Sequence, residues 1–366
     1  MKRATTERPQ QGTIARGALT AVLLLLLFSC AKQPYYIDTI TQQDREGNYR
    51  IRWDVQPSME GNVEIFVSND AFATSWQPFV IEAIRKETTT YTSHDLIEQT
   101  YFLMVFDGQE TRVTSTRVIP TAGPVNLRDI GGYMTDSGQQ MRWGMIYRSG
   151  DLSRIQREDE PLISRMRIKN HLSLASAYGQ PRRSSSQIPY AKFATIEPDV
   201  YVDFNGFQEK IYSGKVDAES VVYFYNDLFN SIAFESTHQI SSVLHFLLEP
   251  EHYPILISDD LGNTRVAFIT MLIQNILGVS RSDIINDYLL SNALLPVNQL
   301  EPHGFFLTTA IQETLTEYYR SRPNDLHSVT SAIEHNYGSI SKYLEEVLDF
   351  DKADQARLRS ILLYRQ

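Results

Sequence analysis

PILISDDLGNTR, residues 254–265, runs directly into VAFITMLIQNILG, residues 266–278. The short apolar run PILI is typical of a buried strand, and the longer apolar run, which ends in a glycine, is typical of a helix with a defined stop. Between them lies a polar turn that contains Gly262 and leads to Arg265. Free backbone N–H groups and the helix dipole converge at such a turn and attract anions. The stretch therefore predicts a phosphate cradle in which Arg265 grips the phosphate.

The segments on either side of this stretch have the spacing of helices that cover a sheet. Apolar residues recur at helical intervals just before the loop and again in the tail, where breaks are expected at Gly338 and Asp351. A helix, a buried strand, an anion loop and a second helix are typical of an α/β sheet flanked by helices. The two apolar stripes are Ile240, Val243, Leu244, Leu247 and Leu248, and Ile340, Tyr343, Leu344, Val347 and Leu348.

Length and composition indicate a folded protein with room for two domains. The chain has 366 residues, of which 42% are hydrophobic and 21% charged, and these values are ordinary for a globular protein. Its formal net charge of −10 argues against a general nucleic-acid binder. Any phosphate site must therefore act through local geometry rather than through long-range attraction.

Residues 1–30 have the features of a lipoprotein signal peptide. A basic start precedes an apolar core, Ala18–Phe28, which is short for a membrane span. The core leads into Ser29 and Cys30, the only cysteine of the chain, in the pattern of a bacterial lipobox. We expect lipidation of Cys30 to attach the protein to a membrane of the bacterial cell envelope, facing outside the cytoplasm. Whether this is the inner or the outer membrane stays open.

Residues 35–121 have the pattern of an all-β module. Polar and apolar residues alternate in Tyr49–Val55 and Asn62–Ser68, and Tyr101–Phe106 ends at the hairpin pair Asp107–Gly108 before a returning strand in Thr111–Ile119. Several short strands at this spacing predict a small β-sandwich, which we expect to act as a spacer or docking module. With Trp53 on an early strand and Tyr101 after the segment LIEQT, the module weakly resembles a fibronectin type III domain.

A linker is expected at Pro120–Pro124, and a second domain is expected over residues 124–366. This domain opens with NLRDIGGY, residues 126–133, and continues through WGMIYRSG, residues 143–150. It resembles the bacterial atypical, cysteine-dependent tyrosine phosphatases, which also act on phosphoserine and phosphoinositides. Further segments similar to that family follow in the same order: Gly278–Val279, Ile284–Asn292, Ile333–Gly338, Lys342–Leu344 and Ala356–Leu362.

The resemblance implies that residues 258–267 are the catalytic loop, which reads H-C-x-A-G-K-D-R-T-G in the family. There the cysteine is the nucleophile, the arginine clamps the phosphoryl oxygens, and the lysine and aspartate assist binding and leaving-group protonation. In this chain Gly262 and Arg265 match. The other positions differ: Ser258 stands for the histidine, Asp259 for the cysteine, Asn263 for the lysine and Thr264 for the aspartate, with Asp260 and Leu261 between them. An upstream D-L-R of the family is replaced by Ser173–Ala175.

These replacements favour a pseudophosphatase that acts as a binding or scaffold protein. A carboxylate is a much weaker nucleophile than an activated thiolate, and the general acid is lost as well. Asp259 can occupy the anion site itself, while Asp260 repels an incoming dianion by on the order of 1 kcal/mol or more. We therefore expect a self-occupied loop, no metal or other cofactor, no nucleic-acid partner, and a phosphorylated protein or lipid or another protein as ligand.

Two alternatives keep hydrolytic activity. In the first, Asp259 is the nucleophile of a phosphatase, although aspartyl-phosphate chemistry normally uses a D-x-D loop and Mg²⁺. In the second, Ser258 is the nucleophile, although the sequence places none of the eight histidines beside it. A basic segment, Pro181–Ser186, could contact a phosphate or headgroup, but a solvated loop is the simpler interpretation.

Overall fold

The computed structural model describes residue 1 and residues 35–93, 99–174, 188 and 191–365. The predicted signal peptide with Cys30 and the basic segment 181–186 lie outside the described residues. Within the described part, no helix combines the length and the apolar character needed to cross a bilayer.

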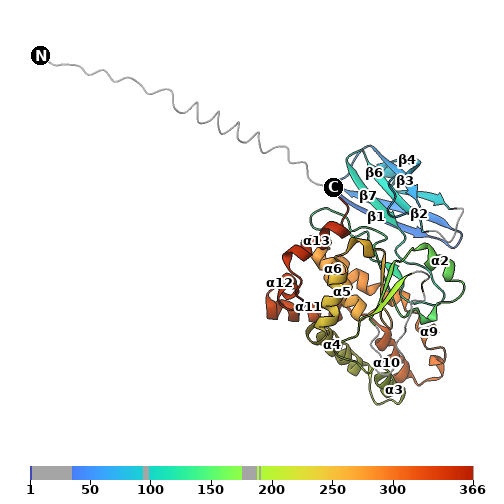
Figure 1. The fold of residues 1–366 in the computed structure, drawn as a ribbon. Coiled ribbons are helices and arrows are strands. Elements are labelled where there is room, and N and C mark those ends of the chain that lie inside the picture. Colours follow the sequence, from blue (N-terminus) through green and yellow to red (C-terminus); the bar gives the residue numbers. More distant parts are fainter. Residues whose placement is uncertain (2–34, 94–98, 175–187, 189–190, 366) are drawn as a thin grey trace.

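The N-terminal part consists of two antiparallel sheets, with strand orders β1-β2-β5 and β4-β3-β6-β7 (Figure 1). Both sheets contribute to one cluster of buried side chains, which includes Trp53 of β2, Ile65 of β3 and Phe102 of β6. The strands are β1 (Tyr36–Gln43), β2 (Asn48–Gln56), β3 (Asn62–Ser68), β4 (Gln77–Ala83), β5 (Thr88–Thr92), β6 (Tyr101–Phe106) and β7 (Glu110–Ser115), with a short 3₁₀ turn η1 (Ile84–Lys86) after β4.

The strands predicted from alternation are confirmed. In β2 the buried and outward-facing residues alternate from Asn48 through Trp53, as expected when one face of a strand packs on a core. The β6–β7 hairpin turns at Asp107 and Gly108, which have φ angles of 48° and 64°. Positive φ at both central residues is the requirement of a tight hairpin turn, and Asp-Gly meets it readily.

The C-terminal part is a mixed α/β arrangement around a five-stranded sheet of order β11-β10-β12-β9-β8. β12 (Ile255–Ser258) lies in the centre and pairs in parallel with β10 (Asn170–Ser173) and β9 (Ile146–Ser149). β11 (Lys192–Thr195) continues the parallel pairing, and β8 (Arg128–Asp129) is antiparallel to β9. All four residues of β12 are buried, so the predicted strand is confirmed.

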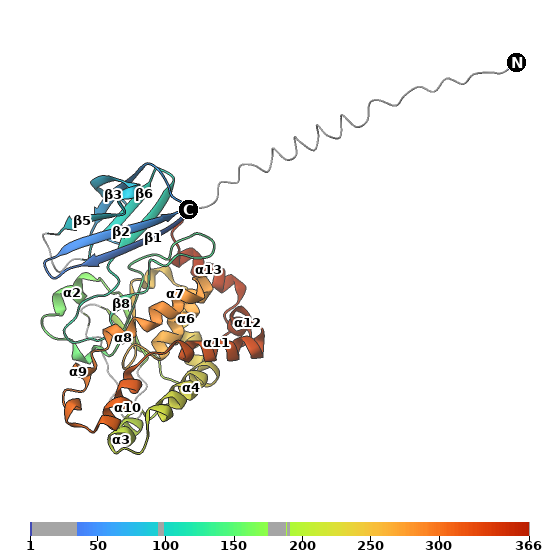
Figure 2. The same ribbon diagram turned by 180° about the vertical axis from the view of Figure 1, so that it is seen from behind.

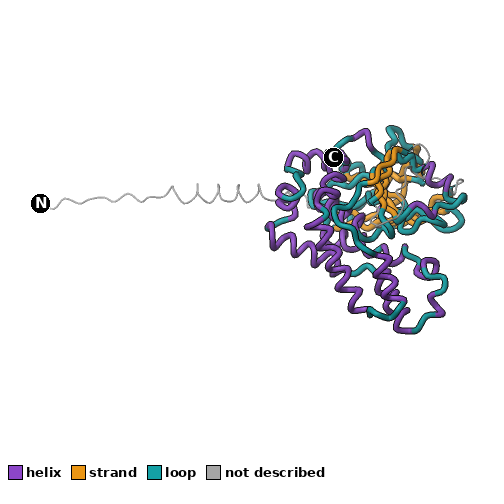
Figure 3. Tube along the Cα trace, turned by 60° about the horizontal axis from the view of Figure 1, so that its bottom comes forward, coloured by secondary structure: helices purple, strands orange, loops and turns teal. Residues whose placement is uncertain are grey.

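Most helices of the C-terminal part are grouped on one side of the strands (Figures 2 and 3). Ile255 and Ile257 of β12 belong to a large cluster with α4, α5 and α6, whereas Leu256 faces a smaller cluster that includes Ile163 of α2. The helices are α2 (Glu160–Arg165), α3 (Phe204–Tyr212), α4 (Ala218–Glu235), α5 (Thr237–Phe246), α6 (Arg265–Leu277), α7 (Arg281–Leu289), α8 (Ser291–Leu294), α9 (Val297–Leu300), α10 (Thr309–Tyr319), α11 (Pro323–Tyr337), α12 (Ile340–Glu346) and α13 (Lys352–Leu362), and the 3₁₀ turns are η2 (Leu152–Arg154), η3 (Pro250–His252) and η4 (Gly304–Phe306).

The helix boundaries follow the predicted signals. α6 ends at Gly278, which adopts a left-handed conformation with φ of 81°. In the tail, Gly338 ends α11 in the same way and Asp351 caps the N-terminus of α13 with its side chain. Both predicted breaks are confirmed.

The two parts are joined by direct packing. Gln140 makes two hydrogen bonds with the backbone of Val113 in β7, at 2.9 Å each, and the indole N–H of Trp143 donates to the Val113 carbonyl at 2.8 Å. The expected linker is held as well, because the Asp159 carboxylate accepts from the N–H groups of Ala122 and Gly123. The linker Pro120–Pro124 is therefore held in place by hydrogen bonds rather than acting as a free spacer.

Candidate functional site

The candidate site is the turn between β12 and α6, at the carboxyl end of the central strand. In open α/β sheets this edge is where ligands normally bind. Gly262, with φ of 72°, brings the turn against the end of β9, and a Cβ there would lie 2.7 Å from the Ser149 carbonyl carbon. Only glycine fits this position, so the matched glycine shapes the cradle.

Asp259 fills the cradle with its own carboxylate. One oxygen, Oδ1, accepts a hydrogen bond from the Gly262 N–H at 2.5 Å. The other, Oδ2, accepts from the Val266 N–H at 3.0 Å and from the Thr264 hydroxyl at 3.1 Å. The residue is 3% exposed. Donors at the start of α6 that could hold an external anion are thus already paired with a carboxylate of the chain.

Arg265 lies on the first turn of α6 and is only 1% exposed. Its Nη2 donates to the Val200 carbonyl at 3.0 Å, and no ion pair joins it to Asp259. Its Nε and Nη1 are buried and have no hydrogen-bond partner among the described residues. Burial lowers the pKa of Arg265, and the nearby carboxylates of Asp259 and Asp260 act in the opposite direction. The guanidinium therefore keeps donors that the self-occupied loop does not use.

The other residues of the loop, Asp260, Leu261 and Asn263, are buried or half-buried. Asp260 and Leu261 are half-buried, and the Asp260 carbonyl accepts from the Asp151 N–H at 3.2 Å. Asn263, where the resemblance leads one to expect a lysine, is buried, and neither atom of its amide group has a partner in the described part of the chain. Asn263 and Arg265 thus carry buried polar atoms that have no hydrogen-bond partner among the described residues.

Ser258, at the end of β12, contacts a histidine that the sequence did not reveal. Its hydroxyl lies 2.8 Å from Nε2 of His171 in β10, and both residues are buried. The sequence alone could place no histidine beside Ser258, and the structure supplies one. His171 and Ser258 are 87 residues apart in the chain and meet because β10 pairs in parallel with β12. No pattern in the local sequence predicts a contact of this kind.

An ion cluster beneath the loop joins the separated motifs. Arg148 of β9 donates to Asp287 of α7 at 2.9 Å and to the Gly262 carbonyl at 2.6 Å. Arg128 of β8 donates to the Asp287 carbonyl at 2.9 Å and its Nε lies 3.4 Å from the Asp287 carboxylate. Asn126 adds a bond from its amide to the Leu261 carbonyl at 2.9 Å. The motifs NLRD, YRSG and INDY thus fix the backbone of the turn.

Burial and charge act against each other in this cluster. Burial opposes ionisation of Asp287, yet Arg128 and Arg148 hold the pKa of this carboxyl below its ordinary value. Burial and the neighbouring Arg128 lower the pKa of Arg148 to about 10, and Asp287 limits the fall. Arg128, Arg148 and Asp287 lie in the three motifs, but the motifs by themselves did not indicate that these residues pair. Their pairing joins elements up to 159 residues apart in the chain, and the sequence carried no local signal for it.

Ser173, at the position of the family's upstream aspartate, is the last residue of β10, and Ala175 lies outside the described residues. Among the described residues, no group of three or more His, Cys, Asp or Glu is placed to hold a metal ion.

Residues 119–364 match a family described as "Tyrosine phosphatase family". The chain is 22% identical over 283 residues to the triple specificity protein phosphatase PtpB of Mycobacterium tuberculosis, a match that covers 66% of this chain and 97% of that protein. Among solved structures, the core catalytic domain of a PP-IP phosphatase from S. cerevisiae is 14% identical, with 59% of this chain and 94% of that chain covered. Its TM-score of 0.26 is too low to support an argument.

Proposed function

The chain belongs to the tyrosine phosphatase family, and on that premise we propose that it is a pseudophosphatase that binds partners at the bacterial cell envelope instead of hydrolysing phosphate esters. The observation that carries the proposal is the carboxylate of Asp259 at the nucleophile position, paired with donors of its own loop. A cysteine thiolate at this position would attack phosphorus, whereas a carboxylate that already accepts three hydrogen bonds has little nucleophilicity left.

The retained scaffold supports a binding role. Arg128, Arg148 and Asp287 hold the turn in shape although the reactive groups are gone. Loss of one member of a buried ion cluster leaves the other charges unpaired and destabilises the fold. The cluster is therefore retained for stability, and it keeps the loop in shape whether or not the loop catalyses a reaction. The loop then serves as a structural feature of a binding surface, and a phosphorylated protein or lipid would have to displace Asp259 to enter the cradle.

The proposed setting follows from the N-terminal region. Cys30 is the lipidation site that anchors the chain to a membrane of the envelope, facing outside the cytoplasm. Residues 35–121 form a fibronectin III-like β-sandwich that positions the phosphatase-like domain, residues 124–366, relative to that membrane. Two antiparallel sheets that share one buried cluster support the sandwich. The partner is a protein, or a protein or lipid that carries phosphate.

An oxyanion titration tests the self-occupied loop. The wild-type protein and an Arg265→Ala variant are titrated with phosphate and with vanadate, and thermal unfolding is recorded. We expect no stabilisation of the wild type beyond that of the variant at millimolar oxyanion. A clear stabilisation that needs Arg265 would contradict self-occupation.

A second candidate function, residual hydrolysis, is favoured by one observation. The hydroxyl oxygen of Ser258 lies 2.8 Å from Nε2 of His171, a distance that is typical of a nucleophile and its general base. The same contact serves equally well as a buried hydrogen bond between two strands. An Asp259 nucleophile is the other route to activity. Phosphate release by Ser258→Ala and by Asp259→Ala, measured separately, distinguishes the two routes. Loss of release in one variant identifies its residue as the nucleophile, and an unchanged rate in both indicates background hydrolysis.

A further inference from the structure

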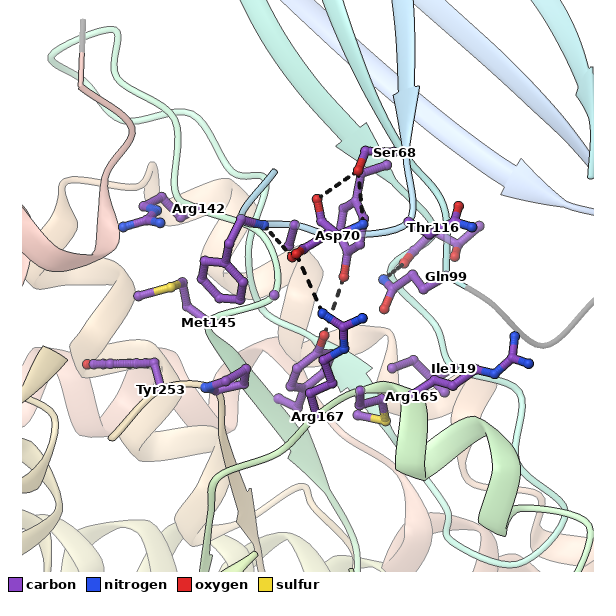
Figure 4. Close-up of a pocket in the computed structure, with 18 of the residues that line it drawn as sticks. Ser68, Asp70, Gln99, Thr116, Ile119, Arg142, Met145, Arg165, Arg167 and Tyr253 are labelled. Carbon is purple, nitrogen blue, oxygen red and sulfur yellow. Dashed lines mark hydrogen bonds and ion pairs between the residues drawn. The ribbon is translucent and has the colours of Figure 1, made fainter. Parts of the chain in front are cut away.

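A cavity of about 940 Å³ lies between the two parts of the molecule (Figure 4). Its lower wall includes Met145, Lys169 and Pro254, which precede β9, β10 and β12. It therefore opens at the amino ends of the parallel strands, whereas the loop follows their carboxyl ends. The two sites share no lining residue.

Three segments from different parts of the chain close around the cavity. The end of β3 and the loop that follows it contribute residues 68–72, the segment between β7 and β8 contributes residues 116 and 118–120, and the turn after α2 contributes Arg167. Phe72 lines the cavity, and Met145 and Tyr253, labelled in Figure 4, add to the apolar part of its wall. A pocket built by both parts exists only when they are docked.

Positive charge gathers around this cavity although the chain as a whole carries −10. Five lining residues are cationic and two are acidic, which leaves a local excess of three positive charges. A cleft lined by one sign of charge concentrates ligands of the opposite sign. The cationic residues are Arg142, Arg165, Arg167, Lys169 and Arg365, and the acidic ones are Asp70 and Glu158.

Arg167 is the cation best placed to receive a ligand. It sits just after α2 with φ of 51°, a left-handed conformation that favours glycine, so a long side chain is unexpected here. Its guanidinium reaches across the mouth to Asp70 at 3.5 Å, and its side chain is 75% exposed. An exposed pair of this kind contributes little stability, so an incoming anion can replace the Asp70 carboxylate at low cost.

We propose that this cavity binds a small organic anion with an aromatic or other apolar body. The volume falls within the range of small-molecule sites, and the combination of apolar walls with a few charged groups is their usual chemistry. The apolar body lies against Phe72, Met145 and Tyr253, and the anionic group is held by Arg167. This site is independent of the phosphatase-like loop and of whether that loop binds phosphate.

Fluorescence titration with anilinonaphthalene sulfonate, an aromatic anion, tests the proposal. The protein used is residues 35–366, which contains every helix and strand of the described chain, in a buffer free of detergent. The neutral compound phenylnaphthylamine, which has the same aromatic body without the sulfonate, is titrated in parallel. We expect saturable micromolar binding of the anion and at least fivefold weaker binding of the neutral compound.

Two variants locate the binding. Arg167→Gly suits the left-handed backbone and removes the charge, so it should weaken the anion at least fivefold and leave the neutral compound unchanged. Val118→Trp, at an exposed lining residue, should block both probes by filling the cavity. Arg320→Ala removes an exposed arginine outside the cavity and should change nothing. Equal affinities for the two probes, absence of saturable binding, or binding that is unaffected by both cavity variants would overturn the proposal.

Discussion

Replacing Asp259 by alanine should turn the loop from a self-occupied turn into an oxyanion site. The substitution leaves three donors without an acceptor: the N–H groups of Gly262 and Val266 and the hydroxyl of Thr264. A buried donor that loses its partner costs about 1–3 kcal/mol, and entering water offsets part of this. We therefore expect the free energy of unfolding to fall by about 3–5 kcal/mol in buffer without oxyanions.

The assay is thermal unfolding of the wild type and the variant with increasing phosphate. Phosphate at about a hundred times its dissociation constant should return about 2.7 kcal/mol to the variant, since it binds only the folded state. The wild type should not respond. Asp227→Ala, which removes an exposed carboxylate of α4 and changes the net charge equally, is the matched control. A variant as stable as the wild type and unresponsive to phosphate would refute the reasoning.

Three further predictions follow from buried polar groups. Asp287→Ala should destabilise the protein by about 3–5 kcal/mol in urea unfolding, because it leaves two buried arginines without their carboxylate; a loss below about 1 kcal/mol would contradict the cluster's role. Burial raises the pKa of Asp129 from 3.8 to about 6, so its contribution to stability is full below pH 3.8 and is lost as pH rises through about 6. The contribution of Asp129 to the free energy of unfolding should fall by about 3 kcal/mol between pH 3.8 and about 6. A difference in unfolding free energy between the wild type and Asp129→Asn that stays constant over this range would argue against the prediction. Ser258→Ala should cost about 1 kcal/mol through the lost bond to His171 and leave background phosphate release unchanged; a fall in phosphate release would favour the Ser258 route.

Local patterns were sufficient to predict the elements that depend on them. The buried strand Ile255–Ser258, the helix that ends at Gly278 and the Asp107–Gly108 hairpin are set by periodicity and by residues with special backbone conformations. The position of Gly262 in the cradle belongs to the same class, because its positive φ and its closeness to β9 admit no other residue.

Contacts between distant elements could not be predicted in this way. The pair of Ser258 and His171 depends on which strand lies beside β12, and the approach of Arg148 to Asp287 depends on how α7 packs under the sheet. Arg265 also differs from the simple prediction: it lies near Asp259 but donates to a backbone carbonyl and keeps two nitrogens unpaired among the described residues. Sequence defined the loop, and tertiary packing determined what each side chain contacts.

The most direct test of the pseudophosphatase proposal is phosphate release from an aryl phosphate by the wild-type protein, with and without Mg²⁺, beside the Arg265→Ala variant. Because Asp259, the residue that the proposal places at the nucleophile position, is a hydrogen-bonded carboxylate, we expect the wild type and the variant to release phosphate at the same background rate under both conditions. Turnover by the wild type that disappears in Arg265→Ala would show that the loop still catalyses and would contradict the proposal.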